Sequence, residues 1–198
     1  MNLLKKLAGE NGFSLGFVSG FRSFDQQKRI IEKKISGKRP ILDDLGHIKK
    51  VEDLTPKNLL FSILRWSALP GFSRHHWGSD FDIYDKNSLP PHYSIQLTPD
   101  EYEDNGPFAS LGSWLRELST SPKNPGFFFP YKKDLGGVAI EPWHISFSPE
   151  IPQFEKFLDH GFFHQFILEN EIPLKEVILE HSQNIFSRFI SASFFNNR

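Results

Sequence analysis

Two short segments gather most of the side chains that could bind a metal. The first is SRHHWGSDFD at residues 73–82, and the second is EPWH at residues 141–144. Together they offer histidine and carboxylate donors, with Glu141 as an additional acid. A catalytic zinc site uses three protein ligands, keeps a fourth tetrahedral position for water, and has a nearby carboxylate that accepts the water's proton. The two segments therefore favour a hydrolytic zinc site.

The choice of ligands within the first segment stays open at this point. Its end is expected to form a strand, in which Asp80 and Asp82 share one face while Phe81 and Ile83 point into the core. Periodicity does not decide which of the two aspartates binds the metal.

The adjacent histidines, His75 and His76, pose the same choice, because only one of them is expected to face the ion. The chain has no cysteine, so thiolate ligands and disulfides are excluded. Any metal must therefore be held by imidazole and carboxylate groups.

Both segments resemble the signatures of a known family, the VanY-type D-alanyl-D-alanine carboxypeptidases. Residues 73–82 match the pattern SxHxxGxxxD, and residues 141–144 match ExWH. A third segment, SGFRSFDQQ at residues 19–27, is similar to the family's SGYRSxxxQ, with Phe21 where Tyr is common. The three segments keep the family's order and cover about residues 15–150. The family belongs to a larger set of zinc peptidases that includes lysostaphin-like enzymes and the hedgehog N-terminal domain.

The resemblance implies a metal site and a reaction. The zinc ligands would be His75, Asp82 and His144, with Glu141 as the general base. The activity would be hydrolysis of the terminal D-alanine from peptidoglycan stem peptides or muropeptides. Pentapeptides would be the substrates of a D,D-carboxypeptidase, and tetrapeptides those of an L,D-carboxypeptidase.

The resemblance also implies a substrate site. Arg22 would engage the substrate and help to stabilise the oxyanion, since a guanidinium can bind a carboxylate through two parallel hydrogen bonds. Gln27 and Ser73 match positions that line the pocket for the terminal carboxylate, and Trp143 would pack beside the metal.

Two positions depart from the family pattern. Asp80 stands where the family usually has a small apolar residue, so it is either a second carboxylate that supports the ligands or a rival ligand. His144 is followed by Ile145, Ser146 and Phe147, without the arginine often seen there. The second departure concerns substrate preference more than metal binding.

Other functions are weighed against these residues. A peptidoglycan endopeptidase is disfavoured by Arg22, because an internal bond offers no free carboxylate. A non-catalytic zinc module is disfavoured by Glu141, because a structural zinc gains nothing from a free base. His160 and His164 have the i, i+4 spacing of a helical zinc motif, but no acid completes HExxH, and we interpret them as structural or surface residues.

Composition bounds the remaining alternatives. The 198 residues carry a net charge of −1, which excludes nucleic acid as the main partner, and no stretch is apolar enough to span a membrane. The N-terminus has no apolar stretch long enough for a signal peptide, so we expect a cytoplasmic protein that acts in cell-wall recycling, or a periplasmic one if a leader has been removed. We also expect a monomer.

The elements that must position these residues indicate an α+β fold, with a small antiparallel sheet that carries the zinc site between helices. One domain is expected over residues 1–198, with 151–198 as a helical extension packed on it. The expected helices are 2–10, 24–35, 55–66, 108–118 and, broken near Pro173, 153–195. The expected strands are 15–18, 79–84, 127–131 and 138–147. A polar loop is expected at 41–53, and a capping box at 98–101.

Overall fold

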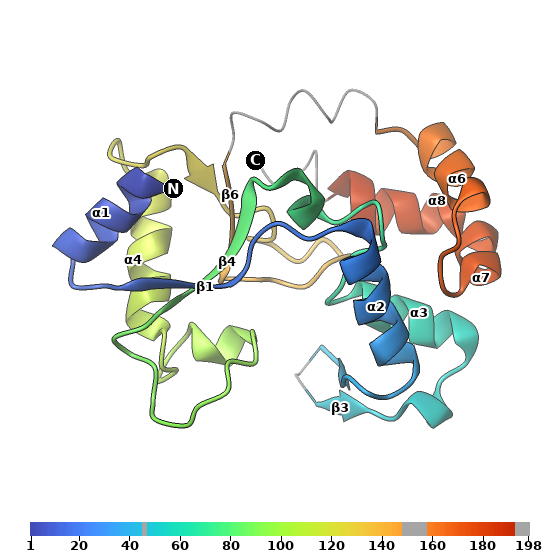
Figure 1. The fold of residues 1–198 in the computed structure, drawn as a ribbon, viewed down its shortest axis with the longest axis horizontal. Helices are drawn as coiled ribbons and strands as arrows, with labels where there is room; N and C mark the ends of the chain where they lie inside the picture. Colours follow the sequence, from blue (N-terminus) through green and yellow to red (C-terminus); the bar gives the residue numbers. More distant parts are fainter. Residues whose placement is uncertain (45–46, 148–157, 193–198) are drawn as a thin grey trace.

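A four-stranded antiparallel sheet forms the centre of the computed structural model, which describes residues 1–44, 47–147 and 158–192. Its strand order is β1-β4-β6-β5, made of Leu15–Ser19, Asp80–Asp85, His144–Phe147 and Phe127–Phe128. Helices gather at both ends of the molecule with the sheet between them (Figure 1). The α+β class is therefore confirmed, and no described helix is long and apolar enough to cross a bilayer.

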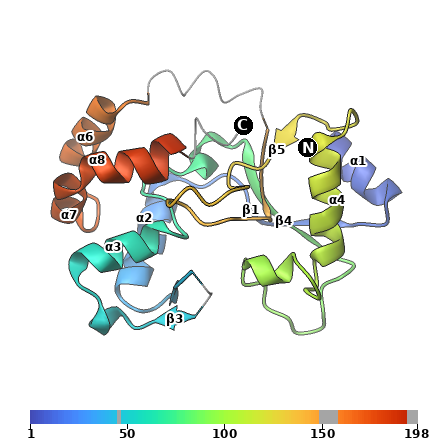
Figure 2. The ribbon, with the colours of Figure 1, turned by 180° about the vertical axis from the view of Figure 1, so that it is seen from behind.

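One group of helices lies beside the first strand's beginning and the other beside its end (Figures 1 and 2). The first group is α1 (Asn2–Glu10) and α4 (Ala109–Thr120). The second group comprises α2 (Phe24–Ile35), α3 (Pro56–Leu64), α6 (His160–Glu169), α7 (Lys175–Glu180), α8 (Ser182–Ile185) and the π-helical turn Phe186–Ser191. Short 3-10 turns are Val51–Asp53, Arg74–Trp77 and Pro99–Glu101.

Each group has its own apolar cluster. Around α1 and α4 the buried residues include Leu4, Leu115 and Trp143. In the second group, Phe72 packs its ring against those of Phe163 and Phe166, at centroid separations of 4.9 and 5.1 Å. The α6–α8 helices thereby bury the segment that leads directly into the first metal-binding motif.

The loop that precedes residues 141–144 is tied to two helices. Arg65, the C-cap of α3, forms an ion pair with Asp134 and donates to the carbonyl of Gly137 at 2.6 Å. Arg188 donates from the C-terminal turn to the carbonyl of Gly136 at 2.7 Å. A Cβ at Gly137 would lie 1.9 Å from the Arg188 carbonyl oxygen, so only glycine allows this approach.

Several sequence expectations are confirmed. The helices at 2–10 and 24–35 have the expected bounds, and the capping box at residues 98–101 forms at the start of a 3-10 turn. The C-terminal helices are interrupted around Pro173, since α6 ends at Glu169 and α7 begins at Lys175. Residues 153–157 and 193–195 of that expected stretch lie outside the described residues.

Three expectations about strands were wrong. The strand expected at 138–147 begins only at His144, because the residues before it form a turn. The polar loop at 41–53 contains a two-stranded ladder, β2 (Ile41–Leu42) with β3 (Ile48–Lys49). The strand expected at 127–131 is shorter, because β5 contains only Phe127–Phe128. By contrast, Ile83 is fully buried in the core as expected, and Phe81 packs half-buried against the same cluster.

Candidate metal centre

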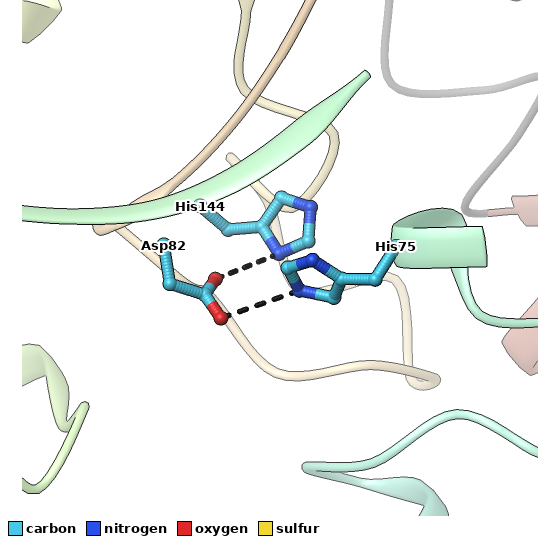
Figure 3. A group of neighbouring side chains, drawn as sticks. All are labelled: His75, Asp82 and His144. Atoms are coloured by element: carbon cyan, nitrogen blue, oxygen red, sulfur yellow. Dashed lines mark ion pairs between the residues drawn. The ribbon is translucent and has the colours of Figure 1, made fainter. Parts of the chain in front are cut away.

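Strands β4 and β6 bring the three expected ligands together. Asp82 lies opposite His144 in the antiparallel ladder, which places their side chains side by side. His75 comes from the 3-10 turn before β4, and Gly78 ends that turn with a φ of 73° that favours glycine. The Asp82 carboxylate lies 3.2 Å from His75 Nε2 and 3.2 Å from His144 Nδ1 (Figure 3). One ligand atom from each residue lies within 4.8 Å of the others, and all three residues are buried.

A backbone carbonyl orients the first histidine. Nδ1 of His75 lies 2.8 Å from the carbonyl oxygen of Gly20. Because a carbonyl only accepts, Nδ1 must carry the proton, and Nε2 then directs its lone pair toward Asp82. Gly20 follows a bulge in β1, where the register shifts between Phe17 and Ser19. Beyond the bulge, Ser19 lies directly opposite Asp82, so Gly20 is close to the ligands.

A second carboxylate orients the other histidine. Nε2 of His144 lies 2.9 Å from Oδ1 of Asp80, while its Nδ1 faces Asp82. A carboxylate that holds the far ring nitrogen of a histidine is the usual support of a metal-binding imidazole. The geometry therefore favours Asp82 for the ligand position and Asp80 for the support of His144, the choice that periodicity left open.

The Asp80 carboxylate is surrounded by donors. Arg74 Nε, Ser79 Oγ and Ser146 Oγ lie 2.8, 2.6 and 2.9 Å from its oxygens, in addition to His144. Asp80 is 0% and Arg74 1% exposed, so this is a buried ion pair. Burial favours the neutral acid, but the bond to His144 and the charge of Arg74 outweigh it and hold the pKa of Asp80 well below its usual range.

The Asp82 carboxylate is buried as deeply but is less fully bonded. Its Oδ1 has no hydrogen-bond partner despite being shielded from solvent. Burial favours protonation, yet the neighbouring His144 and His75 outweigh it and lower the pKa of this carboxyl below its usual range. A buried, charged oxygen without a donor fits a cation ligand.

Electrostatics at His144 agree with a cation position. Burial opposes the charged imidazolium, but the neighbouring carboxylates of Asp80, Asp82 and Glu141 outweigh it and raise the pKa of His144 well above its usual value. Three carboxylates thus direct their charge at one imidazole, a local excess of negative charge that a divalent ion would balance.

His76 does not join the site. Its Nδ1 lies 2.5 Å from the carbonyl of Arg22, and its Nε2 accepts from the Gly71 amide at 3.0 Å. Both ring nitrogens are therefore used in holding two loops together. Burial lowers the pKa of His76, which agrees with a neutral structural imidazole.

Glu141 approaches the site through a turn. The His144 amide donates to the Glu141 carbonyl at 3.1 Å, and this bend brings Oε2 of Glu141 to 3.3 Å from His144 Nδ1. Oε2 thus lies beside the ring nitrogen that faces Asp82, while the side chain is 11% exposed. A carboxylate in this position can take a proton from a molecule bound between the ligands.

Arg22 is held at the edge of the centre. Its Nη1 donates to Gln27 Oε1 and its Nη2 to Ser19 Oγ, both at 2.7 Å, and Gln27 is itself fixed by a bond to the Ala68 carbonyl at 2.6 Å. Ser23 starts α2 with a capping box, which fixes the chain immediately after Arg22. Gln27 is fully buried, and its side chain bonds to Arg22 and to the Ala68 carbonyl.

The remaining expected site residues lie close by. Ser73 is buried, and its carbonyl accepts from the His76 amide at 3.0 Å. Trp143 is 3% exposed and packs its ring against Tyr102 in the core, adjacent in sequence to His144. Their contacts with a substrate stay predictions.

Sequence reasoning missed Arg74 and Ser146, which complete the Asp80 cluster. A partial signal was present, because a buried aspartate is usually paired with a cation, and Arg74 and Lys86, each six residues away, are the nearest arginine and lysine along the chain. Tyr131 was also missed; its ring packs edge-on against His144 at 4.9 Å. No sequence signal pointed to it.

The other histidine pair stays outside the centre. His160 lies 3.3 Å from Ser182 Oγ, and its ring centroid is 6.1 Å from that of His164. Within the residues that the structure describes, the group His75, Asp82 and His144 is the one that gathers metal-binding atoms.

Comparisons with known proteins agree with this geometry. The family described as VanY, D-alanyl-D-alanine carboxypeptidase, matches residues 1–150. An uncharacterized protein of Haemophilus influenzae is 33% identical over 120 residues, 60% of this chain and 89% of that protein. YodJ of Bacillus subtilis, a candidate carboxypeptidase by its description, is 28% identical over 145 residues, 71% of this chain and 40% of YodJ. The solved structure of VanYB in complex with D-alanine-D-alanine shares the fold, with a TM-score of 0.50 at 21% identity over 89% of this chain and 78% of its own.

Proposed function

Because the chain belongs to the VanY family of D-alanyl-D-alanine carboxypeptidases, we propose that it is a zinc-dependent carboxypeptidase that removes the terminal D-alanine from peptidoglycan stem peptides. The observation that carries this proposal is the buried group of His75, Asp82 and His144 with Glu141 beside it. A binding module would need the three ligands alone, whereas a hydrolase also needs the adjacent base.

The donor set fits zinc. Two imidazole nitrogens and one carboxylate are common ligands of catalytic zinc, whose bonds of about 2.0–2.2 Å place tetrahedral ligand atoms about 3.4 Å apart. Each histidine lies 3.2 Å from a different oxygen of Asp82, close to that separation, and one ligand atom from each of the three residues lies within 4.8 Å of the others. When bound there, zinc would supply Lewis-acid chemistry by polarising the scissile carbonyl and acidifying water.

The chain's own groups would manage the proton. Glu141 Oε2 is the carboxylate oxygen at the ligand face of His144, so it would accept a proton from the attacking water. The same oxygen can return the proton to the nitrogen of the leaving D-alanine. The Glu141 amide donates to the backbone carbonyl of Tyr131 at 3.1 Å, which holds the backbone of the base in place.

Arg22 would recognise the free end of the peptide. Its guanidinium is fixed by Gln27 and Ser19 before any substrate arrives, which lowers the entropic cost of binding a carboxylate. The Asp82 and Glu141 charges lie close enough to act on Arg22, although burial has the larger effect and lowers its pKa. This preorganised cation supports an exopeptidase over an endopeptidase.

Incubation of the zinc-loaded protein with defined tri-, tetra- and pentapeptide muropeptides, with products identified by mass spectrometry, tests the proposal. Release of D-alanine from the pentapeptide would assign a D,D-carboxypeptidase, and release from the tetrapeptide an L,D-carboxypeptidase. Glu141→Gln is the control, because it keeps the shape of the side chain but removes the proton acceptor. We expect this variant to retain zinc and its activity to fall by a factor of about 10²–10⁴.

Three results would contradict the proposal. Cleavage of cross-linked dimers in preference to single stems would favour an endopeptidase. Equal cleavage of peptides with free and amidated C-termini would remove the role of Arg22. Full activity in a zinc-replete Glu141→Gln protein would place the base elsewhere.

A further inference from the structure

A basic pocket adjoins the metal centre. It has a volume of about 410 Å³ and lies between the chain segment 18–22 and one face of α2. Its lining includes Arg22, Arg29, Lys33 and Arg39, and no acidic residue. The whole chain carries a net charge of −1, so four cations around one pocket are a local concentration and do not reflect the average surface.

Three cations of this pocket, Arg29, Lys33 and Arg39, lie outside the ion pairs that the described residues form. Within the described part of the chain, the side chains of Arg29, Lys33 and Arg39 form neither a hydrogen bond nor an ion pair with another side chain. Elsewhere the protein pairs its arginines, as Arg65 with Asp44 and Asp134 shows. Unpaired positive charge directed at one pocket is the arrangement expected of an anion site.

A buried lysine lies behind the pocket and supports this interpretation. Lys34 is 9% exposed, and none of the described ion pairs joins it to an acid. Burial first, and the nearby charge of Arg39 second, lower the pKa of Lys34 to about 8, while the more weakly acting Glu141 opposes them. Lys34 thus places a further positive charge close to Arg39, and this charge is buried and outside the described ion pairs.

We propose that this pocket binds a carboxylate that the substrate carries in addition to its C-terminal one, which makes the preferred substrates acidic peptides. The inference rests on the proposed function and narrows its substrate class. Arg22 belongs both to the pocket and to the edge of the metal centre, so a peptide held there can reach both. Exposed Val18 and Phe21 add an apolar rim that suits the small side chains of such a peptide.

Matched peptides test the proposal directly. Two substrates with the same sequence and the same free C-terminus would differ in one internal carboxylate, which is amidated in the second. Zinc-loaded wild-type protein should cleave the acidic peptide with a kcat/KM about 10- to 100-fold higher, because charge-assisted bonds to arginine are lost in the amide. This preference should shrink as ionic strength rises, since the contacts are solvent-accessible.

Charge-removing variants locate the effect. The double variant Arg29→Gln, Lys33→Gln should cleave both peptides at the rate with which wild type cleaves the amidated one. Lys28→Gln combined with Lys57→Gln removes two cations from α2 and α3 outside the pocket lining and should keep the full preference. Retained preference in the first variant, or equal loss in both, would overturn the proposal.

A binding measurement separates this proposal from the proposed function. Titration of a non-cleavable acidic tripeptide, followed by NMR of the Lys34 side chain, should raise the pKa of Lys34, because a bound anion stabilises the ammonium. Its amidated counterpart should leave that pKa unchanged. If wild type cleaves both peptides equally well, this inference fails and the carboxypeptidase stands; if it cleaves neither while the pKa rises on binding, the proposed function fails and the pocket stands.

Discussion

Two carboxylates on the same face of β4 have opposite surroundings. Asp80 and Asp82 are two residues apart, both are buried, and both contact His144. Arg74, Ser79 and Ser146 saturate Asp80 with donors, whereas Oδ1 of Asp82 has no hydrogen-bond partner. The two residues share a type and a strand face, so only their neighbours distinguish the carboxylate that would support a ligand from the one that would be a ligand.

This difference shows how a buried ion pair and a metal site can share one histidine. The Asp80 side is complete without any added group, because a charge balanced by Arg74 and bonded on both oxygens has no need of a cation. The Asp82 side is incomplete, because its negative charge faces two imidazoles whose outer nitrogens are already engaged. Substitutions on the two sides should therefore affect different measurements.

The largest effect is expected on the Asp82 side. Asp82→Asn replaces a charged ligand by a weak neutral one, so most zinc should be lost and activity should fall by at least about 10²–10⁴. Elemental analysis and peptide cleavage measure both. The fold should persist in circular dichroism, because the amide has the same shape.

Loss of the metal in Asp82→Asn together with retention in Asp80→Asn would confirm the comparison. The reverse pattern would exchange the roles of the two aspartates. Zinc retained by both single variants would move the centre away from β4.

The second effect is expected in the stability of the Asp80 side. Arg74→Met leaves a buried carboxylate without its cation, and we expect the free energy of unfolding to fall by about 3–5 kcal/mol. Denaturant melts measure this loss. The double variant Arg74→Met, Asp80→Asn should recover part of it, because the charge left behind is then removed.

Additive losses in that double variant would mean that Arg74 acts through packing and not through Asp80. The ring of Trp77 lies 5.5 Å from the guanidinium and is the contact to consider in that case.

The sequence predicted a ligand set whose side chains the structure brings together, while the residue pattern alone left the choice between the two aspartates open. Helix bounds followed from caps and periodicity, both of which are local. Asp80 and Asp82 could not be separated, because they share a strand face, and the donors that distinguish them include Ser146 from another strand. The turn that shortens the strand expected at residues 138–147 to β6 was not predicted.

A smaller effect is expected where the two sides meet at His144. Asp80→Asn removes the charge that holds Nε2, so zinc affinity should fall by about 10- to 100-fold while binding remains measurable. Competition with a chromogenic chelator on folded protein gives the affinity. Ser146→Ala is the matched control, since it removes one Asp80 donor without touching the histidine, and it should change the affinity less.

An affinity that is unchanged in Asp80→Asn would show that His144 is oriented by its strand alone. Complete loss of zinc would instead make Asp80 a ligand.

The smallest effect concerns a charge that belongs to neither side. Lys34 has a pKa lowered to about 8, against about 10.4 in an unfolded chain. Below pH 8 both states carry the charge, and its burial lowers the stability of the folded protein. Between pH 8 and about 10.5 the folded protein has released the proton and the unfolded chain still holds it, so this loss of stability disappears. Lys34→Met should therefore raise the free energy of unfolding at pH 7 by about 1–3 kcal/mol, and the gain should vanish near pH 10.5.

Urea melts of the two proteins across this pH range provide the measurement. The exposed neighbour Lys33 offers a control, because Lys33→Met should change stability by less than about 0.5 kcal/mol at every pH. A pH-independent gain in Lys34→Met would assign the effect to packing.

The contact between Arg188 and the loop at Gly136–Gly137 has a consequence for how this protein can be divided. The family likeness ends at residue 150, yet a residue far beyond that limit holds the loop that leads to Glu141. A fragment made to the limits of the family would keep every ligand and lose one of the two arginines that fasten this loop. The segment that matches the family is therefore shorter than the segment needed to hold the loop in place. An exchange of C-terminal segments between relatives would have to include the loop that each segment contacts.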